Sequence, residues 1–130
     1  MKKVLTIVIV LFCGIVITGC GASKLSDNYS EDKLKIAAED TINNLNNEKY
    51  DEIVNSGTEE LKSGLSQDKI KEAWSPLKEK LGSYKEISKI SFQEKDGTAV
   101  VVAIAEYENG KAQFTLSYNK DMKLAGIYMK

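Results

Sequence analysis

Three glutamates are the side chains of this sequence whose type and position could support acid–base chemistry. Carboxyl groups held in an apolar pocket act as general acids and bases. Alternation along the expected strands points Glu86 and Glu94 inward, but both lie near strand ends, and Glu106 falls on the outer face opposite Ile87. Charged residues at strand ends are usually solvated, so we expect no catalytic residue among them.

Two residue types that are common in active sites are absent. All 18 basic residues are lysines, and the 130-residue chain contains neither His nor Arg. Imidazole acid–base or metal chemistry and bidentate Arg capture of phosphate are therefore excluded. No calcium loop, zinc pattern, phosphate loop or nucleophile elbow occurs, so we expect no metal and no cofactor.

Cys20 has a chemical context of its own. Two lysines and an uncharged apolar run over residues 4–16 precede Ile17-Thr18-Gly19-Cys20, an order typical of a secretory signal peptide. The last four residues resemble the lipobox of bacterial lipoproteins, in which the Cys thiol carries diacylglycerol. We expect cleavage after Gly19 and lipidation of Cys20. The alternative is a transmembrane anchor, because residues 4–23 are long enough to cross a bilayer.

Cleavage would leave a lipid-anchored protein on the extracytoplasmic face of the cell membrane. The mature chain would hold 16 basic and 19 acidic residues, a formal charge of −3 that argues against nucleic-acid binding. Cys13 would leave with the leader, so no disulfide could form within the domain. We expect a signal peptide over 1–19, a lipidated Cys and tether over 20–30, and one α+β domain over 31–130.

The elements that must position these residues begin with helices. Ser30 can cap a helix, and the apolar spacing after it gives one buried stripe. Helical spacing continues around Tyr50, and a further turn is expected after Gly57. Ser66 or Asp68 opens a last long helix, and Gly82 suits its end.

After Gly82 the apolar period changes to two, which predicts four antiparallel strands. Asp96-Gly97 and Asn109-Gly110 are hairpin signals. Two-residue loops there would pair Ile90 with Ala103 and Ala103 with Leu116. A three-residue turn after Tyr118 would point Leu124, Gly126 and Tyr128 inward.

The predicted register separates two faces of the sheet. Aromatic side chains on the helix side could line a cavity, although ordinary core packing explains the same pattern; they are Trp74, Tyr84, Tyr107, Phe114, Tyr118 and Tyr128. The opposite face carries Val100, Val102 and Ile104 among polar residues. Such a patch can be a partner surface, or it can reflect the preference of β-branched residues for a central strand.

Helices followed by a curved antiparallel sheet resemble the nuclear transport factor 2-like, or cystatin-like, α+β cone. Landmarks of the domain of unknown function 3887 family, found mainly in Gram-positive bacteria, are also similar; they are Tyr50-Asp51-Glu52-Ile53-Val54, Trp74 with Leu77, Gly82, Asp96-Gly97, Tyr107 with Gly110, Phe114 and Ala125-Gly126-Ile127-Tyr128. The resemblance spans roughly residues 31–130. It implies a fold and no reaction.

These observations lead us to expect a secreted, membrane-anchored, non-enzymatic domain that binds a ligand or a protein partner at the cell envelope. Homodimerisation through the Val100, Val102, Ile104 face is one expected mode. The alternatives are a small-pocket enzyme of isomerase or hydratase type and an inhibitor or immunity-type lipoprotein. A deep cavity with a buried carboxylate would favour the enzyme.

Overall fold

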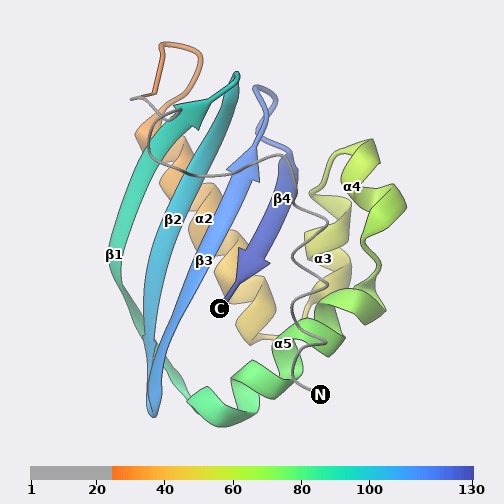
Figure 1. Ribbon diagram of the computed structural model, residues 1–130, viewed down its shortest axis with the longest axis vertical. Helices are drawn as coiled ribbons and strands as arrows, with labels where there is room; N and C mark the ends of the chain where they lie inside the picture. The colour runs from red at the N-terminus through yellow and green to blue at the C-terminus, as the bar shows by residue number, and fades with distance from the viewer. Residues whose placement is uncertain (1–24) are drawn as a thin grey trace.

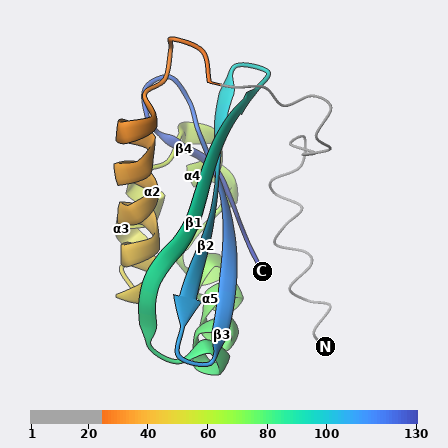
Figure 2. The same cartoon turned by 90° about the vertical axis from the view of Figure 1, so that its left-hand side faces the viewer.

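A computed structural model describes residues 25–130 (Figure 1). Four helices come first in this part of the chain: α2 (Glu31–Asn46), α3 (Tyr50–Asn55), α4 (Glu59–Gly64) and α5 (Gln67–Leu81). Four strands follow: β1 (Tyr84–Lys95), β2 (Thr98–Tyr107), β3 (Gly110–Tyr118) and β4 (Leu124–Met129). They form one antiparallel sheet in the order β1-β2-β3-β4, with α2 against one face (Figure 2). The predicted α+β class is confirmed.

The helices begin where capping residues allow them to begin. The side-chain oxygens of Ser30, Thr58 and Ser66 accept hydrogen bonds from the backbone of α2, α4 and α5. Each cap satisfies an amide that has no partner inside its helix. Gly82 ends α5 with φ 80° and ψ −147°, a conformation essentially confined to glycine. The predicted cap at Ser30 and the stop at Gly82 are confirmed, and of the two predicted starts of the last helix, Ser66 and Asp68, Ser66 is the cap.

The first hairpin has the register that the sequence predicts. Ile90 pairs with Ala103 and Phe92 with Val101 around Asp96-Gly97, where both residues have positive φ. A positive φ at both central residues is what a type I′ turn requires, and its twist matches that of the strands.

The second hairpin is shifted by two residues from the prediction. Ala103 pairs with Phe114 rather than Leu116, and the turn residues are Glu108 and Asn109 instead of Asn109 and Gly110. The turn is fixed from outside the hairpin, because the amide of Glu108 donates to Ser83 O and that of Asn109 to Leu81 O, both at 2.8 Å. A shift of two leaves every side chain on its predicted face.

Irregular register in the two edge strands moves some side chains to the opposite face of the sheet. In β1 the register shifts at Lys85 and at Ser88, so Ile87 packs against the core while Glu86 lies opposite Glu106. The prediction that Glu86 points inward, and the predicted pairing of Glu106 with Ile87, are therefore wrong. Bulges insert one unpaired residue and reverse the alternation beyond it.

A bulge in β4 has the same effect on its second half. Tyr118 pairs with Leu124 and Ser117 with Gly126, which leaves Ala125 as the extra residue. Leu124 is buried as predicted. Gly126 and Tyr128 instead share the face of Ser117 and Thr115, away from the helices, so their predicted inward orientation is wrong.

The helices and the inner face of the sheet enclose one apolar core. Its largest fully buried side chains include Trp74 from α5 and Phe114 from β3. Tyr29 also belongs to the core, with 9% of its surface exposed, and Leu25 packs against it. The domain therefore begins before residue 31, and the predicted tether over 20–30 is wrong at least for Leu25 and Tyr29. The lipobox, with Gly19 and Cys20, lies outside the described residues.

Candidate functional site

Four of the six aromatic residues predicted to line a cavity meet in the core instead. Trp74 and Phe114 have no exposed surface, and their ring centroids are 5.6 Å apart. Trp74 also lies 6.0 Å from Tyr107, and Tyr118 is 2% exposed. Trp74, Phe114 and Tyr107 pack together between α5 and the sheet, and Tyr118 lies against α2, as the packing alternative supposed.

The other two aromatic residues lie elsewhere. Tyr84, at the start of β1, is 36% exposed and places its ring edge-on to Tyr107 with centroids 5.4 Å apart. Tyr128 pairs with Thr115 on the face opposite the helices. Tyr128 therefore lines no cavity on the helix side.

The buried hydroxyls of Tyr107 and Tyr118 form hydrogen bonds within the core. Tyr107 donates to Asn46 Oδ1 at 2.7 Å, and the hydroxyls of Tyr118 and Thr41 share a hydrogen bond of 2.9 Å. Burial raises the pKa of both Tyr107 and Tyr118 well above the usual value. Both groups therefore stay protonated at any physiological pH and cannot serve as bases.

Glu94 lies far along β1 from Glu86 and Glu106, the other two glutamates considered in the sequence. Glu94 Oε1 accepts from the amide of Ser26 at 2.8 Å, and this hydrogen bond lowers the pKa of Glu94. Glu86 and Glu106 stand opposite each other on strands β1 and β2. Within residues 25–130 no three His, Cys, Asp or Glu side chains come close enough to hold a metal ion.

An open groove of about 410 Å³ lies between α2 and the first half of β1. The two bulges of β1 fall in this half, and bulges commonly occur beside functional sites because they redirect side chains. The wall formed by α2 consists of residues four apart on one helix face, Lys35, Glu39 and Asn43. The wall formed by β1 consists of residues 84–90.

The groove carries both signs of charge. Lys35, Lys85 and Lys89 supply ammonium groups, and Glu39 and Glu86 supply carboxylates. None of these five groups forms an ion pair within residues 25–130. The pKa of Tyr84 is raised, first by burial of its hydroxyl and then by the negative charges of Glu39 and Glu86. Two carboxylates therefore lie near the Tyr84 hydroxyl, and the groove could hold groups of either charge.

Sequence reasoning missed this groove. The polar residues of α2 that line it follow an i, i+4, i+8 spacing, which indicates a shared face but does not say what the face meets. The bulges at Lys85 and Ser88 leave no recognisable signal in the sequence. Only the packed structure brings the two walls together.

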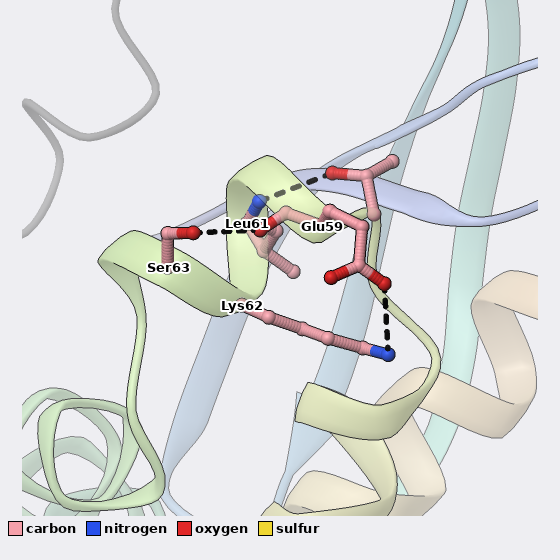
Figure 3. Close-up of polar contacts among 5 residues, drawn as sticks. Glu59, Leu61, Lys62 and Ser63 are labelled. Atoms are coloured by element: carbon pink, nitrogen blue, oxygen red, sulfur yellow. Dashed lines mark hydrogen bonds and ion pairs between the residues drawn. The ribbon is translucent and has the colours of Figure 1, made fainter.

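A second hollow, of about 240 Å³, lies between α4 and β4 and includes Leu61, Leu65 and Ala125. Figure 3 shows the polar contacts within α4 and its cap. Thr58 Oγ1 accepts a hydrogen bond from the amide of Leu61 at 3.1 Å, and Lys62 Nζ lies 3.7 Å from Glu59 Oε2. Ser63 donates its hydroxyl to the Glu59 carbonyl at 3.0 Å. These contacts are local to α4 and point to a structural role.

The predicted interface on the outer face is less exposed than its sequence suggests. Val100 has no exposed surface, and Val102 and Ile104 are half-buried. Among the described residues the large apolar side chains that stand exposed are Ile36 and Tyr84, on α2 and β1. The predicted homodimer through this face stays a prediction. No helix of residues 25–130 is long and apolar enough to cross a membrane.

Comparison with known proteins places the fold in context. The family model described as Protein of unknown function (DUF3887) matches residues 38–127. A protein from Ruminococcus gnavus ATCC 29149, solved by NMR, has a similar structure with a TM-score of 0.71 and 24% sequence identity. The similarity covers 82% of this chain and 96% of that one. No curated protein gives a significant match.

Proposed function

We propose that this chain, which belongs to the DUF3887 family of proteins of unknown function, is a lipid-anchored, non-enzymatic binding domain at the extracytoplasmic face of the cell membrane. Its ligand would occupy the groove between α2 and β1. The observation that carries this proposal is the contrast between a core filled by Trp74 and Phe114 and an open groove beside it.

The groove suits a polar ligand with both charges, such as a short extended peptide. Its volume of about 410 Å³ lies within the range of small-ligand sites, ~300–1,000 Å³. β1 is an edge strand, so its free backbone amides and carbonyls can pair with an extended chain. Unpaired lysines and glutamates on the walls can meet the two ends of such a chain.

The rival small-pocket enzyme would need a buried carboxylate in a deep cavity. The inner face of the sheet carries apolar and aromatic side chains, and Glu94 near its end bonds the Ser26 amide. These observations favour binding over catalysis. An inhibitor or immunity-type lipoprotein would be a special case of the proposed binding, with a protein as the ligand.

The groove is tested by NMR titration of residues 25–130 with a panel of tetrapeptides that carry free termini. We expect amide shifts to concentrate at residues 84–90 and at Lys35, Glu39 and Asn43. Lys85→Glu should weaken binding roughly three- to tenfold, as expected for one exposed charge pair. Lys120→Glu, the same change on the turn after β3, is the matched control. Shifts spread over the surface, or an equal effect of both variants, would exclude the groove.

The anchor is tested separately on the full chain in a bacterial host. We expect the mature protein to float with membranes and to carry a diacylglyceryl group on Cys20 by mass spectrometry. Cys20→Ser should abolish the modification, and a Cys20→Ser chain produced without residues 1–19 should no longer float. An unmodified Cys20 on a membrane-bound chain would favour the transmembrane alternative.

A further inference from the structure

The described part of the chain starts at one end of the sheet. The amide of Ser26 donates to Glu94 Oε1 at 2.8 Å, and the hydroxyl of Tyr29 donates to the Gly97 carbonyl at 2.6 Å. Glu94 and Gly97 belong to the β1–β2 hairpin. The turn after β3 lies beside this hairpin, since Tyr118 pairs with Ala99. We call this the hairpin end of the domain; it is at the top of Figure 1.

We infer that the domain is held with its hairpin end toward the bilayer and its groove directed away from the membrane. The inference rests on the proposed anchor at Cys20. Six residue steps separate Cys20 from Ser26, and a fully extended chain spans at most ~3.6 Å per residue. The hairpin end therefore stays within roughly 20 Å of the anchor.

The groove runs along β1 from Tyr84, at the other end of the strand, to Ile90, so most of its β1 wall lies in the half of the strand away from the hairpin end. Tyr84, the first residue of β1, is ten positions before Glu94, and a strand rises about 3.3 Å per residue, so these residues are roughly 30 Å apart. Figure 1 shows the start of β1 and the end of α5 together at the bottom of the molecule. The far end is held only through the body of the domain, so its mean distance from the bilayer is greater.

The net charge of the mature chain favours the same orientation. With the leader removed, the chain has 16 basic and 19 acidic residues, and a domain of negative charge is not drawn flat onto an anionic bilayer. Two bonds fix the near end, one at Ser26 and one at Tyr29, and the tether beyond them is short. The ligand of the groove is accordingly a molecule of the aqueous or cell-wall side and not a bilayer lipid.

The experiment uses the lipidated chain in phosphatidylglycerol vesicles whose headgroups carry an energy-transfer acceptor. Cys13 and Cys20 are the two cysteines of the sequence, so a donor dye can be placed on a single introduced thiol. Lys120→Cys labels the hairpin end, and Lys80→Cys labels the last turn of α5 at the far end. Both lysines are exposed, which makes the two variants a matched pair.

We expect a larger loss of donor emission from position 120 than from position 80. Equal losses, or a larger loss at position 80, would overturn the inferred orientation while flotation of the same vesicles still upheld the anchor. Failure of the labelled chain to float, with Cys20 unmodified, would overturn the anchor and the orientation together. A Cys20→Ser chain produced without residues 1–19 should lose no emission at either position.

Discussion

Gly82 links three elements through a backbone conformation that other residues rarely adopt. A Cβ built at this position would lie 2.9 Å from Glu108 Oε1 and 3.0 Å from Asn109 Nδ2. The same turn residues bond the flanking backbone at Leu81 and Ser83. The glycine therefore allows the end of α5 to approach the β2–β3 turn closely.

Gly82→Ala should destabilise residues 25–130 by about 1–3 kcal/mol from backbone strain, with a further contribution from displaced side chains. Gly97→Ala is the control, because Gly97 has nearly the same φ, 82° against 80°, but no atom within 4 Å of the added Cβ. Urea unfolding of both variants gives the comparison. Equal losses would show that Glu108 and Asn109 move aside freely.

Trp74 combines full burial with an unpartnered polar atom. Its Nε1 is one of four buried side-chain polar atoms without a hydrogen-bond partner in residues 25–130. Leaving such a donor unpaired costs ~1–3 kcal/mol, which offsets part of what the ring contributes by packing.

Trp74→Ala should therefore cost ~3–5 kcal/mol in the free energy of unfolding, and Trp74→Phe distinctly less, because phenylalanine removes the unpaired N–H and keeps most of the ring. Chemical denaturation measures both. If Trp74→Phe were as costly as Trp74→Ala, the indole N–H would have a partner in solution, such as a bound water.

Among the elements, the segment before α2 is held by contacts distant in sequence. Ser26 and Tyr29 reach partners 68 residues away, on the β1–β2 hairpin. Release of this segment would lengthen the tether that fixes the hairpin end near the membrane.

Acid should release the Ser26 contact. The pKa of Glu94 in the folded state is lowered from 4.5 by the amide of Ser26, so the contact is complete above pH 4.5 and is lost as the pH falls through the lowered value. An NMR titration of the Ser26 amide from pH 7 to 2 should show this transition. Glu94→Gln should remove it, and an unchanged titration in that variant would assign the transition to another group.

At the scale of the whole molecule, the predicted homodimer would form through the outer sheet face. Val102 and Ile104 are half-buried there, among small and polar neighbours such as Thr115 and Ser117. A homodimer through this face would follow a twofold axis that brings the same patch of both copies together.

If that dimer forms, Val102→Lys should convert it to monomer without loss of helix or strand content, because the charge would be buried without a partner. Sedimentation of residues 25–130 at high concentration, with circular dichroism as the folding control, measures this. Lys120→Glu, on the turn after β3, should leave the association unchanged. A wild-type domain that is monomeric throughout would eliminate the outer-face dimer.

The sequence by itself determined what depends on local periodicity and on local turn chemistry. Caps at Ser30 and Ser66, the stop at Gly82 and the register around Asp96-Gly97 follow from interactions among near neighbours. The α+β class follows from the change of apolar period after Gly82. The expected lipobox at Cys20 also comes from sequence alone and awaits its test.

Tertiary structure decided what depends on partners far away in the chain. Tyr29 lies in the core, where its hydroxyl donates to the carbonyls of Gly97 and Tyr118. The local sequence indicates only a polar tether. The second hairpin takes its register from the backbone at Leu81 and Ser83. Bulges at Lys85, Ser88 and Ala125 reassign faces, since one extra residue changes alternation without changing composition. The two bulges of β1 lie in the part of that strand that lines the groove.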